Sequence, residues 1–324
     1  MKKLLLLLSA LLLAFLFTEF LVSDVVCYPK YGVERKIVGI RSSDNGIQNV
    51  YIPHSEYWNV EGGNRVFRRN NLGLPGTDVK VSDSSRYVLV LGSSYIEAYQ
   101  VPPDSMATSI FQRKLSNDEP RFQVVNLGHS GHDPYDSYLR SAYFDRTFQP
   151  AAVVLVIQDN GAAWLSRHPH PLAFTRPAGF GKRTTSLITE VAIFARNHSS
   201  LINIIATAIK ADEEKRARDE VVSRIGKSPV NLAHEAAIPE DLLTCFKEFY
   251  KKYEERFWVL SILPDGRQND LLREYCGKRH IKFLGKELGI RDNLIAGSGH
   301  LNVGGNRVLG ELLYDSFVRF AKKP

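Results

Sequence analysis

The feature that most constrains the fold of this chain is a series of short apolar runs that alternate with helical patterns. The runs lie at 87–91, 122–127, 152–157, 258–263 and 281–284. Short, almost wholly apolar runs are typical of strands that are covered on both faces. The helical patterns lie at 105–115, 240–256, 270–279 and 304–321. This alternation predicts a parallel sheet with helices on both sides, and Asp104 is the expected N-cap of the first helix.

The first residues form the clearest single segment. Lys2 and Lys3 precede an apolar run over 4–17, and apolar residues resume at 20–22. Positive charge before an apolar segment stays in the cytoplasm, so the rest of the chain is expected on the extracytoplasmic (periplasmic) side of the cell membrane. No A-x-A-like cleavage motif stands out, which favours a single uncleaved span. A signal peptide that is cleaved, leaving a secreted domain, is the alternative.

Composition and periodicity divide the chain into three parts. Residues 1–26 are expected to be the anchor or signal peptide, and 27–80 an irregular extension that packs on the core. The main domain follows at 81–324, with a helical insertion at about 162–239. A run of mixed charge at 210–224 is typical of a solvated helix. The insertion is expected to decorate the core, and a lid or a partner-binding surface are the alternatives.

Charge and cysteine content exclude some classes of function. The net charge of +7 suits an anionic surface such as a membrane leaflet, yet no dense Lys/Arg stripe is present, so nucleic-acid binding is not expected. The three cysteines are Cys27, Cys245 and Cys276. Their spacing fits no zinc site, and in an exported domain the last two either form one disulfide or stay free.

Polar residues gather at the points where the expected strands end. Because ligands of open parallel sheets bind beyond the carboxyl ends of the strands, the loops at 92–94, 128–133, 158–161 and 298–302 are expected to meet in one pocket. A serine hydroxyl in such a pocket needs a base to take its proton, and a histidine titrates in the right range. Glycine N–H groups and an asparagine amide can hold an oxyanion. These residue types together indicate acyl transfer.

His129, His132 and Asp133 also lie in the second of these loops. Their spacing is not a known ligand pattern, so no metal is expected there. Glu97, which follows the first strand, is expected to be a solvated acid or an acid at a helix entry. Ser93 is a second, less favoured candidate for the reactive hydroxyl.

The order of the strand-end residues resembles the SGNH hydrolase (GDSL-like esterase/lipase) superfamily. The matching blocks are Gly92-Ser93-Ser94, Asn126 to Gly131, Asn160 and His300. The resemblance covers about 80–324 and implies a doubly wound, flavodoxin-like three-layer α/β/α fold with about five parallel strands. It implies that Ser94 is the nucleophile and His300 the base. It further implies oxyanion donors at Ser94, Gly131 and Asn160, and no cofactor.

The segment 70–76 resembles the lead-in of envelope-associated members of that superfamily, including polysaccharide O-acetylation proteins. The chain departs from the superfamily at two acids: Ser93 stands beside the nucleophile, and Gly297 stands where an aspartate should orient the histidine. A triad without its acid loses orientation of the imidazole. The residues that can support the site instead are Ser93, Asp159, Asp292 and, by its place at a strand end, Asp265.

Two classes of function follow. The first is a serine esterase or O-acyltransferase that acts on an acylated small molecule or on an ester of an envelope glycan or lipid-linked sugar, held at the membrane by its N-terminal helix. The second is a catalytically inactive binding or assembly protein of the cell envelope with the same fold, which the missing acids favour. A third, weaker alternative makes the helical insertion the binding surface for a partner in an envelope complex.

Overall fold

The computed structural model describes a set of segments of the chain. They are residues 2–21, 34–36, 49–51, 53–54, 56–59, 65–82, 84–158, 199, 202, 240–263, 266–288, 293–295 and 299–321. The chain divides into two compact units. The first comprises 1–33, 56–58 and 183–235, and the second comprises 34–55, 59–182 and 236–324.

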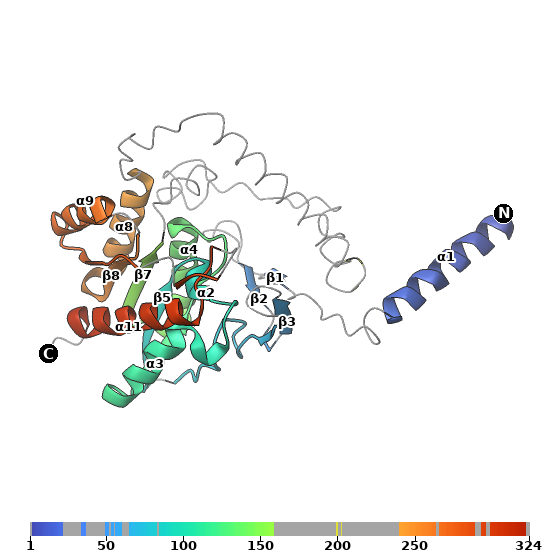
Figure 1. Cartoon of the computed structure of the whole chain (residues 1–324), viewed down its shortest axis with the longest axis horizontal. Coiled ribbons are helices and arrows are strands. Elements are labelled where there is room, and N and C mark those ends of the chain that lie inside the picture. Colours follow the sequence, from blue (N-terminus) through green and yellow to red (C-terminus); the bar gives the residue numbers. More distant parts are fainter. Residues whose placement is uncertain are drawn as a thin grey trace. The chain divides into compact units, whose positions relative to one another are not determined.

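The second unit is built around a five-stranded sheet (Figure 1). Its strands are β5 (Arg86–Leu91), β6 (Phe122–Asn126), β7 (Ala152–Ile157), β8 (Phe257–Ser261) and β9 (Lys282–Gly285). The order across the sheet is β6-β5-β7-β8-β9, and every neighbouring pair is parallel. Numbered along the chain this is 2-1-3-4-5, the flavodoxin-like order of a doubly wound sheet. The predicted fold class is therefore confirmed.

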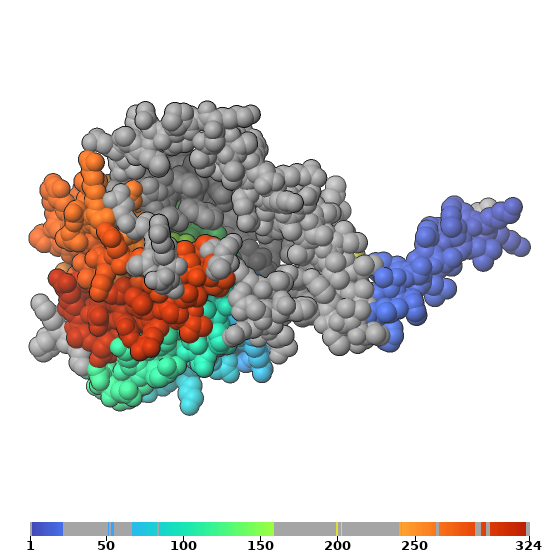
Figure 2. Space-filling model, in the orientation of Figure 1, coloured from blue at the N-terminus to red at the C-terminus, as the bar shows by residue number. Residues whose placement is uncertain are grey.

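Helices cover both faces of this sheet. They are α3 (Ala107–Asp118), α4 (Pro134–Phe148), α8 (Glu240–Tyr253), α9 (Gly266–Gly277) and α11 (Val303–Phe320). Alternate residues of β5 enter two separate cores, since Leu89 packs with α4, α8 and α9 while Val90 packs with α3 and α11. Helix α11 lies along α3, and both present their outer sides to solvent in Figure 2. The result is three layers, as the sequence predicts.

Capping groups explain where two of these helices begin. Asp133 and Asp136 form a reciprocal capping box at the start of α4, with Pro134 in its first turn. Asn302 caps α11 by accepting from Gly305 N–H at 2.9 Å. Helix α3 has Met106 as its N-cap and is preceded by a 3₁₀ turn, η3 (Pro103–Ser105). The prediction of Asp104 as the cap is wrong, because Pro103 starts that 3₁₀ turn one residue earlier.

Other helix boundaries differ modestly from the predicted ranges. The pattern at 240–256 splits into α8 and a 3₁₀ turn, η5 (Glu254–Arg256), where Glu254 takes a left-handed φ of 51°. Helix α9 ends at Gly277, and the chain then turns through His280, whose φ is 59°. Helix α4 is additional to the predicted set, because its polar and aromatic sequence carries no clear apolar stripe.

The extension before the sheet contains more regular structure than the predicted irregular segment. Four short strands lie in it: β1 (Glu34–Lys36), β2 (Asn49–Tyr51), β3 (Glu56–Asn59) and β4 (Arg65–Arg68). Strands β1 and β2 form an antiparallel pair. Short strands of this kind lack the sustained alternation on which a prediction from sequence depends.

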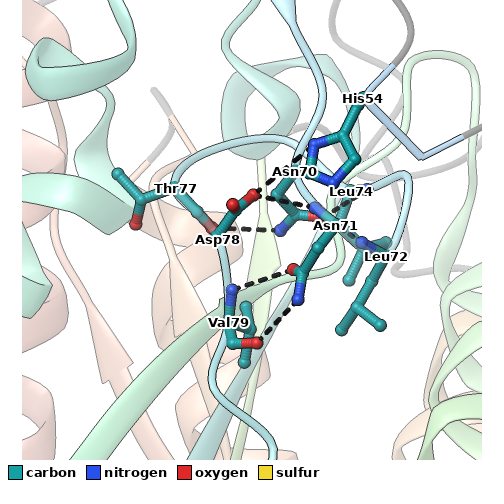
Figure 3. Close-up of polar contacts among 8 residues, drawn as sticks. All are labelled: His54, Asn70, Asn71, Leu72, Leu74, Thr77, Asp78 and Val79. Atoms are coloured by element: carbon teal, nitrogen blue, oxygen red, sulfur yellow. Dashed lines mark hydrogen bonds and ion pairs between the residues drawn. The ribbon is translucent and has the colours of Figure 1, made fainter.

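An ordered loop over 70–79 connects this extension to the sheet, and Figure 3 shows the side chains that hold it. Asn70 Oδ1 accepts from the N–H groups of Leu72 and Leu74, both at 2.9 Å. Asn71 exchanges two hydrogen bonds of 3.0 Å with the backbone of Val79. Leu74 and Val79 are buried against the core that contains α4 and α8. The two asparagine side chains therefore fix the backbone of the loop by hydrogen bonds within it.

The first unit contains α1 (Lys2–Phe20), a helix of 19 residues. At 1.5 Å per residue it is about 28 Å long, close to the ~30 Å hydrocarbon core of a bilayer. By length and composition it can cross a membrane, and an N-terminal signal sequence has the same properties. In the same unit Ser199 Oγ donates to Glu19 Oε2 at 2.7 Å. Apart from Ser199 and Ile202, the predicted insertion lies outside the described residues.

Cys245 and Cys276 are buried and are not joined by a disulfide, so of the two alternatives from the sequence the disulfide is wrong. The two side chains lie in different packing clusters, Cys245 with Tyr135 and Leu139, and Cys276 with the core of α8 and α9. Burial raises the pKa of Cys276 to about 12, since the thiolate would lose its hydration. Cys27 lies outside the described residues.

Candidate active site

The turn that follows β5 carries the predicted nucleophile. Ser94 is half-buried and is the first residue of the one-turn helix α2 (Ser94–Glu97). The helix closes at Ala98, whose φ of 54° is left-handed and whose N–H donates to Ser94 O at 2.9 Å. A Cβ on Gly92 would lie 2.7 Å from the Ile96 side chain and 3.3 Å from Val156 O. The tight path from strand to helix therefore requires glycine before Ser93.

A second turn, over 128–132, passes directly over α2. Asn126 Nδ2 at the end of β6 donates to Ile96 O at 2.7 Å, and Asn126 Oδ1 accepts from Gly128 N–H at 2.9 Å. His129 N–H donates to Gly92 O at 3.1 Å. Gly131, the predicted oxyanion donor, is exposed and has a φ of 80°, a conformation that favours glycine. The loop thus stands beside the Ser94 turn, with Gly131 at its outer end.

His300 is half-buried in the turn that precedes α11. Its backbone oxygen accepts from Ile295 N–H at 2.9 Å, and Leu301 forms an antiparallel bridge with Leu294. The hydroxyl of Tyr95 donates to Gly299 O at 2.8 Å. Tyr95 and Gly299 are the chain neighbours of Ser94 and His300. This bond therefore holds the Ser94 turn beside the His300 turn, although about two hundred residues separate them in the sequence.

Several predicted site residues lie outside the described residues. They are Asp159, Asn160, Asp265, Asp292 and Gly297. The third oxyanion donor and the acid that orients the histidine therefore remain predictions. Gln158, directly after β7, is the last described residue before Asp159 and Asn160.

A small cavity lies between the ends of β5 and β7 and the start of α4. Ser93, His132, Asp133, Ser137 and Gln158 supply its polar lining. Its volume of about 20 Å³ is enough for one water molecule. Ser93 Oγ is buried there without a hydrogen-bond partner among the described residues. The choice of Ser94 over Ser93 as the reactive hydroxyl stays a prediction.

A buried charge lies beneath the 128–132 turn and was missed by the sequence reasoning. Glu97 is 0% exposed, so the expectation of a solvated acid is wrong. Its Oε2 accepts from Ser130 N–H at 2.6 Å, and its Oε1 lies 3.5 Å from the Tyr51 hydroxyl. Arg140 of α4 is also fully buried; burial lowers its pKa, and the negative charge of Glu97 opposes that shift. The two groups are more than forty residues apart in the sequence, so only the folded chain reveals that they interact.

Planar side chains stack beside this charge. The Arg69 guanidinium carbon lies 3.4 Å from the centre of the Tyr51 ring, and Tyr51 stacks on His129 with centroids 5.3 Å apart. His129 and His132 stack at 4.0 Å. His129 Nδ1 lies 2.9 Å from Ser130 O. Within the described part of the chain, no three His, Cys, Asp or Glu side chains are grouped as metal ligands.

The strand order and the helices on both faces define a doubly wound, three-layer α/β/α fold, in which the turns that carry Ser94 and His300 lie side by side. No protein-family model matches the sequence, and no curated protein matches it. Among solved structures, the chain is similar to a psychrotrophic esterase from Pseudoalteromonas sp. The identity is 12%, the TM-score is 0.43, and the match covers 74% of this chain and 100% of that one.

Two further solved structures are similar at the same level. One is a lipase/acylhydrolase from Enterococcus faecalis, with 15% identity, a TM-score of 0.40 and coverage of 74% of this chain and 100% of that one. The other is a G-D-S-L family lipolytic protein from Desulfitobacterium hafniense, with 13% identity, a TM-score of 0.38 and coverage of 72% and 99%. The fold assignment itself rests on the strand order and parallel registers described above.

Proposed function

We propose that this chain is a serine esterase or O-acyltransferase in which Ser94 is the nucleophile and His300 the general base. The observation that supports the proposal most is the hydrogen bond from the Tyr95 hydroxyl to Gly299 O at 2.8 Å. It brings the turn with the hydroxyl next to the turn with the imidazole. A serine hydroxyl becomes a useful nucleophile only when a base of this kind is within reach.

In the proposed reaction Ser94 Oγ attacks the ester carbonyl carbon while His300 takes the hydroxyl proton. The oxyanion that forms is held by the N–H groups of Ser94 and Gly131 and by the Asn160 amide. The carbonyl then re-forms, the bond to the alcohol breaks, and His300 returns its proton to the departing oxygen. The acyl group on Ser94 is next transferred to water in an esterase, or to an acceptor hydroxyl in a transferase.

In the proposed centre, a group other than the superfamily's usual acid supports the His300 ring. Gly297 stands where the related hydrolases have the acid. Asp292, a few residues upstream of the His300 turn, is the candidate acceptor for the far nitrogen of the ring, and a backbone carbonyl can serve instead. Ser93 and Asp159 complete the set of supporting residues that we propose.

The substrate class follows from the expected location. A 19-residue apolar helix preceded by Lys2 and Lys3 supports an anchor in the cell membrane, with the catalytic domain on the extracytoplasmic side. Secretion after cleavage is the alternative. In either case the accessible esters are those of the envelope, and we propose an acylated glycan or lipid-linked sugar as substrate, with no cofactor.

Labelling with a fluorophosphonate, together with hydrolysis of short acyl esters, tests the proposal. The wild-type protein should be labelled on Ser94 and should hydrolyse the ester. Ser94→Ala should lose labelling and roughly 10⁴- to 10⁶-fold of the rate. Ser116→Ala, which changes an exposed serine of α3, is the matched control and should keep both. Unlabelled wild-type protein without esterase or transferase activity would refute the enzyme assignment.

The second candidate is a non-catalytic binding or assembly protein of the envelope, which Gly297 in place of an acid favours. In that case Ser94→Ala would leave the binding of acylated glycans unchanged while the wild-type protein showed no turnover. Deleting about 165–235 and measuring association with envelope proteins tests the third alternative, in which the insertion is the binding surface.

A further inference from the structure

We propose that Glu97 is a positioning residue that holds the 128–132 loop, and with it the N–H of Gly131, in the geometry that the oxyanion needs. This inference rests on the proposed function, because it assigns a role within the same site. Glu97 does not touch substrate, since its side chain is 0% exposed. It acts through the backbone of the loop.

The contact with the loop is short and charge-assisted. Ser130 N–H donates to Glu97 Oε2 at 2.6 Å, and Ser130 is the residue directly before Gly131. A carboxylate that accepts from a backbone N–H forms a stronger bond than a neutral acceptor. Two more constraints act on the same loop: His129 N–H donates to Gly92 O, and Gly128 lies so close to α2 that a Cβ would be 2.3 Å from Glu97 N.

A countercharge makes the buried carboxylate tolerable. Removing one partner of a buried ion pair is strongly destabilising because it leaves an uncompensated charge, whereas replacing both partners is often tolerated. Arg140 of α4 is fully buried, and the charge of Glu97 acts on it more than that of any other group. Removing one charge alone therefore harms the site, while removing both should be better tolerated. This difference separates a positioning role from simple packing.

The extension before the sheet completes the surroundings of Glu97. Tyr51 of β2 places its hydroxyl 3.5 Å from Glu97 Oε1, and the Arg69 guanidinium covers the Tyr51 ring. Arg69 Nε also donates to the Tyr99 hydroxyl at 3.2 Å. Arg69 leads into the braced loop of Figure 3, where Asn70 fixes the backbone that follows. The extension thus supports the 128–132 loop through the contact of Tyr51 with Glu97.

The test compares three variants of the full chain with the wild-type protein: Glu97→Gln, Glu97→Gln with Arg140→Met, and the exposed Glu274→Gln as a control. Hydrogen–deuterium exchange of a peptide spanning 126–133 reports the loop directly. In Glu97→Gln this exchange should rise by about 10-fold or more. Since a misplacement of about 1 Å costs up to ~10²-fold in rate, kcat should fall by roughly 10- to 100-fold while KM stays within about twofold. Glu274→Gln should change neither quantity.

The double variant, Glu97→Gln with Arg140→Met, separates an effect on the loop from general unfolding of the Glu97→Gln protein. Without either buried charge it should melt closer to the wild-type protein than Glu97→Gln does, yet keep the fast loop exchange and the low kcat. Unchanged exchange at 126–133 in both Glu97 variants would overturn the inference, as would faster exchange with unchanged kcat. If the wild-type protein is itself unlabelled and inactive, the proposed function fails. The exchange data alone then decide whether Glu97 fixes the loop.

Discussion

Replacing Gly128 with alanine tests the packing of the 128–132 loop on α2. A Cβ at this position would lie 2.3 Å from Glu97 N, 2.6 Å from Ile96 C and 2.8 Å from Ile96 Cβ. The first two neighbours are backbone atoms, which cannot turn aside as the end of a long side chain can. To restore an ordinary contact of about 3.5 Å, the loop or α2 has to move by about 1.2 Å.

A movement of that size has two costs. Overpacking in a well-filled region costs about 1–3 kcal/mol. The same movement stretches the bonds from His129 N–H to Gly92 O at 3.1 Å and from Ser130 N–H to Glu97 Oε2 at 2.6 Å, each contributing about 1 kcal/mol or more. The loop can relax so that part of the overpacking cost is exchanged for weaker hydrogen bonds. Gly128→Ala should therefore lower the free energy of unfolding by about 2–4 kcal/mol. The melting temperature should fall by roughly 5–15 °C.

Thermal unfolding followed by circular dichroism measures this effect, and Gly277→Ala is the matched control. Gly277 ends α9, and a Cβ there meets nothing within 4 Å. The control should leave stability unchanged or raise it by up to about 1 kcal/mol, because alanine is the better helix residue. If Gly128→Ala melted within about 1 °C of the wild-type protein, the close approach of the loop to α2 would be refuted.

Three further predictions follow from individual contacts. Asp133→Ala should remove the capping box of α4 and cost about 1 kcal/mol in a denaturant melt, with Asp133→Asn losing less. Trp258→Phe should cost about 1–3 kcal/mol in the same melt, because Trp258 Nε1 donates to the buried Ser316 Oγ at 3.1 Å; a loss below about 0.5 kcal/mol would contradict the bond. Cys245 and Cys276 should not react with a thiol reagent in the native protein near pH 8, since both are buried. Burial raises the pKa of Cys276 from 9.0 to about 12. Between these two pH values the thiol ionises in the unfolded chain but stays neutral in the folded one, so the stability that is full below pH 9 falls by up to about 1.4 kcal/mol per pH unit. Cys276→Ala should flatten that slope in urea melts.

The sequence by itself determined the sheet. Strands buried on both faces must be apolar throughout, so β7 was predicted at its observed bounds, and β5 within one residue. The sequence also predicts the turns after β5 and β6 that carry Ser94 and Gly131, because polar residues follow each apolar run, and it predicts the turn with His300 before α11. These are local patterns, readable within a window of a few residues.

Only the tertiary structure decided what depends on distant partners. Helix α4 hides Arg140 beside Glu97, and a charged residue gives no local sign that a countercharge will bury it. Cys245 and Cys276 likewise form no disulfide because they pack into two different clusters. The bond from Tyr95 to Gly299 joins turns about two hundred residues apart. Local periodicity reports which face of an element is apolar, whereas the identity of the partner on that face is a property of the folded chain alone.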